Sequence, residues 1–208
     1  MITSLTNTLH YKTLADTSSG QFKEKGSRFI GYAFPCSSEE EVRELLGSVR
    51  KQHHQSTHVC YAYRLGWNKE RVRANDDGEP ANSAGMPILG QIQSFDLTNV
   101  LVAVVRYYGG TKLGVGGLMS AYKTAAHLAL AESTIEERDL KKRVHVELDP
   151  TNYAFFMQQI KLFRMTILEQ DTSTGYFMEL SVPVDLWDEF VKFATQQKGI
   201  KLEDKGYI

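Results

Sequence analysis

A cluster of glycines is the stretch of this sequence whose residue types and spacing are best suited to chemistry. Five of the sixteen glycines fall within nine residues, from Gly109 to Gly117. The cluster follows the apolar run Val100 to Val105, which is typical of a buried strand, and precedes an amphipathic helix. Glycines let backbone N–H groups face a ligand, and a helix N-terminus favours an anion. The pattern predicts either an anion site or a strand-to-helix turn that needs glycine without any ligand.

Basic and aromatic side chains flank the glycines. Arg106 offers a planar fork for phosphate and Lys112 a positive charge, while tyrosines can stack on nucleic-acid bases. The stretch is not a P-loop, since no Gly-Lys-Ser/Thr ends it, and its glycines are too close together for G-x-G-x-x-G. The predicted anion or nucleic-acid site comprises Ser27, Arg28, His58, Arg106, Tyr107, Tyr108, Gly109, Gly110, Lys112, Gly114, Gly116 and Gly117.

An acidic loop is the second candidate for chemistry. Asp76, Asp77 and Glu79 place three carboxylates within four residues. Oxygen ligands of this kind hold Mg²⁺, and a carboxylate can also act as a general base. A solvated surface loop that caps the following helix is the alternative interpretation. A functional role requires this loop to lie beside the glycines, which the sequence alone does not establish.

Zinc and thiol chemistry find little support. His58 and Cys60 share one face of a predicted strand, but side chains at i and i+2 lie about 7 Å apart, too far for a nucleophile pair. Zinc needs four ligands in a recognisable spacing, and the chain has two cysteines and no CxxC motif. We therefore predict no catalytic residue and no cofactor, with Mg²⁺ at the acidic loop left open.

Composition limits the classes of function. The chain has 208 residues, of which 42% are apolar and 24% charged, as in an ordinary globular protein. Its net charge of −1 argues neither for nor against nucleic acid, so only a local basic patch could bind one. No apolar run approaches the ~20 residues that span a bilayer. The sequence predicts a cytoplasmic, reduced protein with no membrane partner.

Apolar periodicity predicts the elements that must position these residues. In the first part of the chain we expect strands at 8–17, 29–34, 57–65 and 100–105 and helices at 39–51, 84–95 and 117–131. The polar segments 21–28 and 66–82 are predicted as loops, and the charged segment 132–142 as a linker. The order strand, helix, strand, strand, helix, strand follows, which is typical of a ferredoxin-like βαββαβ domain. We predict an α+β chain with two domains, 1–136 and 137–208.

Longer motifs in this chain resemble the YigZ/IMPACT family. They occur in one order over about residues 21–131, and the second half resembles the small C-terminal domain of bacterial YigZ-like members. The motifs are Ser27-Arg28-Phe29-Ile30, His58-Val59-Cys60-Tyr61-Ala62-Tyr63, Asp76-Asp77-Gly78-Glu79-Pro80, Ser83-Ala84-Gly85-Met86-Pro87 and the stretch from Val105 to Gly117.

The resemblance implies a fold for each domain. The first should resemble the second domain of ribosomal protein S-five, a β/α fold shared with elongation factor G and small-molecule kinases. The second should resemble the ferredoxin-like C-terminal domain of elongation factor G. The resemblance also implies a cleft that includes Arg28, the acidic loop, Arg106 to Tyr108, Lys112 and the glycines, without any catalytic role.

The resemblance further implies a link with translation, since eukaryotic IMPACT proteins are non-enzymatic regulators of a pathway that acts on translation initiation. The expected partner is RNA, the ribosome or a translation factor, contacted through the glycines and their flank. Two alternatives remain open. One is an enzyme that acts on a nucleotide or small phosphate ester, with a metal held by the Asp76–Glu79 loop. The other is a protein–protein adaptor that docks through its C-terminal sheet.

Overall fold

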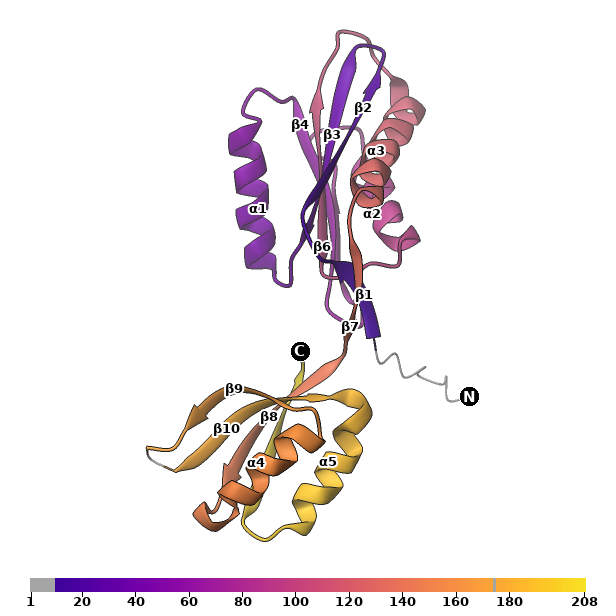
Figure 1. The fold of residues 1–208 in the computed structure, drawn as a ribbon. Helices are drawn as coiled ribbons and strands as arrows, with labels where there is room; N and C mark the ends of the chain where they lie inside the picture. The colour runs from indigo at the N-terminus through magenta and orange to yellow at the C-terminus, as the bar shows by residue number, and fades with distance from the viewer. Residues whose placement is uncertain (1–9, 174) are drawn as a thin grey trace. The chain divides into compact units, whose positions relative to one another are not determined.

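The computed structural model describes residues 10–173 and 175–208, which form two compact units (Figure 1). One unit is Lys12–Glu137, and the other combines residues 10–11 with Arg138–Ile208. The first two residues of the predicted strand 8–17 lie outside the described chain. No helix within the described ranges is long and apolar enough to span a lipid bilayer.

The first unit is built on a five-stranded antiparallel sheet. Its strands, in spatial order, are β2 (Ser18–Glu24), β3 (Ser27–Pro35), β6 (Val100–Tyr107), β4 (His58–Leu65) and β5 (Arg71–Asn75). The apolar run predicted as a buried strand is the central strand β6, which is buried from Val100 to Arg106. A separate two-stranded sheet pairs β1 (His10–Leu14) with β7 (Ile135–Asp139).

Helices cover both faces of the five-stranded sheet (Figure 1). The helix α1 (Glu39–Gln52) packs on one face, and α2 (Gly85–Ser94) and α3 (Gly114–Ala131) lie on the other. Because side chains along β4 point to alternate faces of the sheet, neighbouring residues pack into two separate cores. Val59 belongs to the core on the α1 face, whereas Cys60 belongs to the core under α2 and α3, which we call the α2–α3 core.

Three predicted connections contain strands that the sequence pattern did not reveal. The predicted loops 21–28 and 66–82 include most of β2 and all of β5, and the predicted linker 132–142 contains β7. These are edge or ribbon strands whose side chains are largely exposed, so they lack the apolar alternation that marks a half-buried strand. The predicted loop was therefore wrong at residues 71–75, and the polar segment and the charged linker are in part strands.

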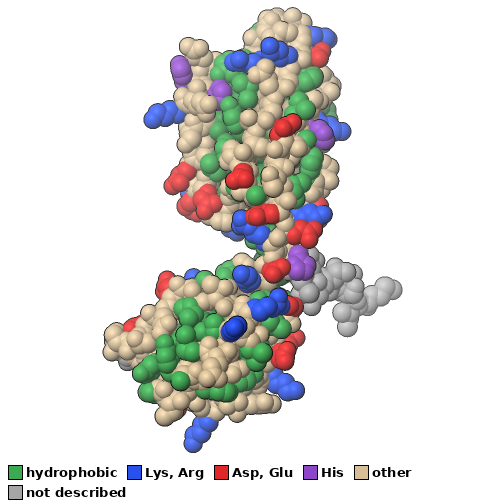
Figure 2. Space-filling view, viewed as in Figure 1, with side chains coloured by type: hydrophobic (Ala, Val, Ile, Leu, Met, Phe, Trp, Pro, Cys, Tyr) green, Lys and Arg blue, Asp and Glu red, His purple; other side chains and the backbone are tan. Residues whose placement is uncertain are grey.

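The second unit has the predicted ferredoxin-like order. Its elements are β8 (Lys141–Leu148), α4 (Tyr153–Leu162), β9 (Thr166–Asp171), β10 (Tyr176–Pro183), α5 (Val184–Gln196) and β11 (Ile200–Tyr207), with a short 3₁₀ turn at Pro150–Asn152. The antiparallel sheet has the order β11-β8-β10-β9. Phe156, Phe163 and Phe190 form an aromatic centre to its core. Figure 2 shows further hydrophobic side chains on the surface of this unit, and Phe155 and Leu162 are among the exposed ones.

Candidate functional site

An open pocket of about 440 Å³ lies in the first unit, where β4 and β6 meet the start of α3. Its wall combines apolar side chains with several polar ones. The lining residues are Thr57, His58, Glu79, Pro80, Arg106, Tyr108, Lys112, Leu113, Gly114, Val115 and Leu118. The pocket thus brings residues of the glycine segment, which we define as residues 109–117, together with one carboxylate of the acidic loop, that of Glu79.

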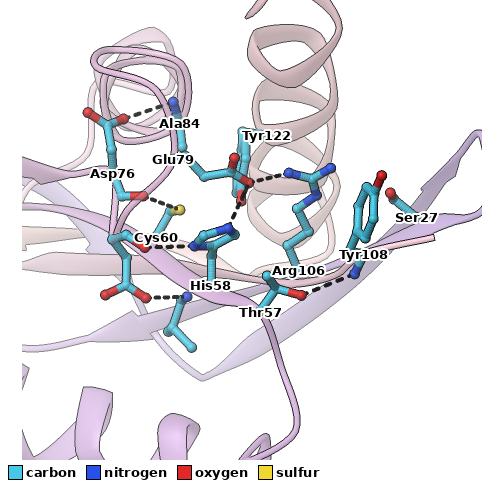
Figure 3. Close-up of polar contacts among 12 residues, drawn as sticks. Ser27, Thr57, His58, Cys60, Asp76, Glu79, Ala84, Arg106, Tyr108 and Tyr122 are labelled. Atoms are coloured by element: carbon cyan, nitrogen blue, oxygen red, sulfur yellow. Dashed lines mark hydrogen bonds and ion pairs between the residues drawn. The ribbon is translucent and has the colours of Figure 1, made fainter. Parts of the chain in front are cut away.

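A buried ion pair forms the polar part of the pocket wall (Figure 3). The guanidinium Nη1 of Arg106 lies 2.6 Å from Oε1 of Glu79, and their side chains are only 7% and 4% exposed. The hydroxyl of Tyr122, on α3, donates to the same carboxylate oxygen at 2.7 Å. Burial raises the pKa of Tyr122, which keeps this hydroxyl protonated and able to donate. Arg106 is therefore held by Glu79, although its buried Nε has no hydrogen-bond partner.

His58 is the cross-strand neighbour of Arg106, because the two residues pair in register on β4 and β6. Its Nδ1–H donates to the backbone carbonyl of Asp77 at 2.7 Å. In the neutral imidazole Nε2 is then the hydrogen-bond acceptor, and it lies 3.9 Å from Oε1 of Glu79. Two residues further along β4, burial raises the pKa of the Cys60 thiol well above its usual value. Cys60 is thus a protonated core residue.

The three carboxylates of the acidic loop point to three different partners. Asp76 accepts hydrogen bonds from the backbone N–H groups of Asn82, Ala84 and Gly85, so it caps the start of α2. Glu79 turns to the pocket. Within residues 10–173 and 175–208 no group of three His, Cys, Asp or Glu side chains could hold a metal ion. The three carboxylates of the acidic loop are therefore turned to different partners and are not gathered around one point.

Asp77 connects the loop to α1 and β4. Its carboxylate forms an ion pair with Arg50 at 2.8 Å and accepts the backbone N–H of Val59 at 2.7 Å. Burial alone would raise the pKa of Asp77, but the hydrogen bonds from Arg50 and Val59 outweigh it and lower the pKa. Asp77 is consequently an ionised structural anchor.

The glycine segment is shaped by close backbone packing. The hydroxyl of Ser27, which is fully buried, accepts the backbone N–H of Gly109 at 3.1 Å. A Cβ atom at Gly109 would lie 1.9 Å from the carbonyl carbon of Gly26. Gly114 has a φ of +71° at the first residue of α3, which begins three residues earlier than predicted. Gly116 and Gly117 therefore lie inside the first turn of the helix.

Seven of the twelve predicted site residues do not line the pocket, and two of these, Arg28 and Tyr107, face away from it. Arg28 and Tyr107 pair in register on β3 and β6, on the face covered by α1. The guanidinium of Arg28 stacks 4.5 Å from the Tyr107 ring centre, and the Tyr107 hydroxyl bonds to Nδ1 of His53. Tyr108, Lys112 and His58 remain at the pocket.

Sequence reasoning missed several residues of the site. The hydroxyl of Thr57 accepts the backbone N–H of Tyr108 at 3.3 Å and helps to hold the segment after β6. Tyr122 falls within the predicted helix 117–131, which was not part of the predicted site. No local pattern indicates that its hydroxyl meets a carboxylate 43 residues away.

The fold and the pocket define an α+β protein of two units, with a polar pocket in the first and a ferredoxin-like second unit. Residues 25–130, about half of the chain, match the model of the Impact N-terminal domain. The chain belongs to the IMPACT family.

Two curated relatives support this assignment, and two solved structures are similar to this chain to different extents. IMPACT family member YvyE of Bacillus subtilis is 37% identical over 141 residues, which are 68% of this chain and 65% of that protein. An IMPACT family member of Haemophilus influenzae is 31% identical over 183 residues, which cover 86% of this chain and 87% of the relative. A crystal structure described as a hypothetical protein aligns over 93% of this chain and 96% of its own, with 26% identity and a TM-score of 0.74. A structure described as the two-domain translational regulator Yih1 is 26% identical, covering 59% of this chain and 47% of its own, with a TM-score of 0.34.

Proposed function

We propose that this chain is a non-enzymatic, translation-associated binding protein that contacts RNA, the ribosome or a translation factor at the mouth of the pocket. Membership of the IMPACT family supports the link with translation, because the family resemblance implies regulators of that process. The arrangement of the pocket carries the binding role: a fixed polar wall of Arg106 and Glu79 stands behind an exposed rim of Tyr108 and Lys112.

The rim has the chemistry of a contact surface. The Tyr108 side chain is 48% exposed, and the Arg106 guanidinium lies 5.5 Å from its ring centre, so the ring is held at the pocket edge. Lys112 is exposed and makes no hydrogen bond or ion pair with the other described residues. An aromatic ring and a cation side by side suit a base with its phosphate, or an acidic loop of a protein factor.

The contacts of the acidic loop favour binding over catalysis. The enzyme alternative needs carboxylates that are available to a metal or a water. Asp76 is engaged by three backbone N–H groups, Asp77 by Arg50 and a backbone N–H, and Glu79 by Arg106 and Tyr122. These interactions use the carboxylates to position the loop.

A titration tests this proposal. Fluorescent single-stranded RNA and purified ribosomes are titrated with the protein at several salt concentrations. Lys112→Glu should weaken binding by about 1–3 kcal/mol if the contact is direct, and affinity for RNA should fall steeply with salt. Lys51→Glu, on the exposed side of α1, is the matched charge reversal and should leave binding unchanged. An affinity equal in both variants, or no binding to either probe, contradicts the proposal.

A further inference from the structure

The outer surface of α2 and α3 carries no acidic side chain. Between residues 80 and 131 the sequence contains a single carboxylate, Asp96, although Asp and Glu make up 25 of the 208 residues. Asp96 follows α2 and is paired with Lys69 and Arg64, so its charge is compensated. The one Lys or Arg side chain on the two helices is Lys123, which is exposed. This surface therefore has a net positive character.

Exposed methionines border a groove on the same surface. Met86, at the start of α2, and Met119, on α3, are 49% and 45% exposed. Together with Pro87, Ser120 and Lys123 they line a hollow of about 460 Å³, which we call the α2–α3 groove. Methionine side chains are flexible and polarisable, and they adapt to the shape of an apolar partner. The two methionines, one from each helix, give this hollow an exposed apolar border.

We propose that the α2–α3 groove docks an acidic amphipathic helix of a partner protein. The apolar face of such a helix would enter the groove between Met86 and Met119, in the way that amphipathic helices occupy apolar grooves. Its Asp or Glu side chains would lie near Lys123, which makes no ion pair with the other described residues. No carboxylate lies on α2 or α3 themselves, and the Asp76 carboxylate at the start of α2 is already engaged by three backbone N–H groups.

Nucleic acid fits this groove less well than a helix. Binding to a phosphate backbone depends on several Lys or Arg contacts, whereas only Lys123 lines the hollow. The groove also differs from the pocket of the proposed function. The two hollows share no lining residue, although Leu118 of the pocket and Met119 of the groove are consecutive on α3. The inference thus goes beyond the proposed function and uses a different surface of the same unit.

Three synthetic peptides of about five helical turns test the inference on the full chain. The first carries leucines at i, i+3, i+4 and i+7 spacing with glutamates elsewhere, the second replaces every glutamate by lysine, and the third scatters the leucines of the first. Fluorescence anisotropy measures their binding. We expect the first peptide to bind about tenfold more tightly than the other two, because it alone combines an apolar face with matching charge.

Variants of exposed residues assign the binding to the groove. Met119→Ser should weaken the acidic peptide about tenfold by removing apolar contact. Lys123→Glu should weaken it about two- to fivefold and strengthen the lysine peptide, a reversal that loss of folding would not produce. Lys112→Glu should leave peptide binding unchanged, so this test is independent of the pocket.

Several outcomes would overturn the inference. Equal affinity for all three peptides, or unchanged affinity in Met119→Ser, would remove the groove as the docking site. Sedimentation that shows self-association lost in Met119→Ser would assign the groove to a second copy of the chain. Binding of anionic phospholipid vesicles without binding of the acidic peptide would assign it to a membrane surface.

Discussion

At the scale of single residues, the Arg106–Glu79 pair joins three parts of the first unit. Glu79 comes from the loop after β5, Arg106 from the central strand β6, and Tyr122 from α3. Removing both charges from water costs free energy, and the short contact and the Tyr122 hydroxyl offset part of that cost. The pair therefore fixes the pocket wall more than it adds to overall stability.

Removal of one partner tests this role. Glu79→Ala leaves the Arg106 guanidinium buried without a counter-charge, so we expect a loss of about 3–5 kcal/mol in the free energy of unfolding. The double variant Glu79→Leu/Arg106→Met removes both charges and should recover most of that loss. Urea denaturation followed by circular dichroism measures both values. A single variant as stable as the parent would show that water already solvates the Arg106 side chain.

The sequence indicated the residues of this site but not their partners. Asp76, Asp77 and Glu79 were singled out together because they are adjacent in sequence, yet their side chains reach α2, Arg50 and Arg106. Their directions depend on the backbone of a tight loop and on register between distant strands. Neither is encoded in a local pattern. The pairing of His58 with Arg106 likewise depends on the order of strands in the sheet, which apolar periodicity does not indicate.

At the scale of elements, the backbone of the glycine segment packs directly against the backbone of the turn between β2 and β3. Gly109 lies against the turn at Gly26 and Ser27, so a side chain there would meet main-chain atoms that cannot move aside. Gly116 differs, because it lies within α3 and a Cβ atom there would meet nothing within 4 Å. The five clustered glycines thus serve different purposes.

Alanine substitutions at these two glycines should therefore have opposite effects. Gly109→Ala forces the β2–β3 turn apart and should destabilise the protein by about 1–3 kcal/mol, as overpacking does. Gly116→Ala should be neutral or stabilise by up to about 1 kcal/mol, since alanine favours a helix more than glycine does. Thermal denaturation of the two variants and the parent measures the difference. Equal destabilisation by both would mean that Gly116 is needed for the start of α3.

Helices and strands were predicted correctly where a buried face leaves an apolar periodicity in the sequence. In α1, Ser38 and Glu41 have the spacing of a capping box, and the Ser38 hydroxyl accepts the backbone N–H of Glu41. The apolar positions at helical spacing are Val42, Leu45, Leu46 and Val49, of which all but the half-buried Leu45 are buried. The Glu41 carboxylate, however, accepts the backbone N–H of Ser37, one residue before the expected partner. Polar edge strands leave no such pattern, because only tertiary pairing makes them strands.

At the scale of the whole molecule, each unit has a core of its own. The five-stranded sheet packs on both faces, with Tyr122 and Phe29 among the largest buried side chains of the first unit. The second unit is centred on Phe156 and Phe190. The ferredoxin-like order was predictable, because most of its elements bury one apolar face and leave a regular period in the sequence, although β9 is largely exposed.

The chain offers a separate fluorescent reporter for each unit, because one of its two tryptophans, Trp67, lies in the first and the other, Trp187, in the second. Phe190→Ala removes a fully buried ring that contacts Phe156 and Phe163.

We expect Phe190→Ala to lower the unfolding free energy of the second unit by about 3–5 kcal/mol. In a Trp67→Phe background, Trp187 should report this shift during urea denaturation. In a Trp187→Phe background, Trp67 should report a first-unit transition that Phe190→Ala leaves in place. Ile88→Ala, in the α2–α3 core, is the reciprocal control and should move only the Trp67 transition. Equal shifts of both reporters in either variant would mean that the two cores unfold as one cooperative system, because independent cores transmit no loss of packing to each other.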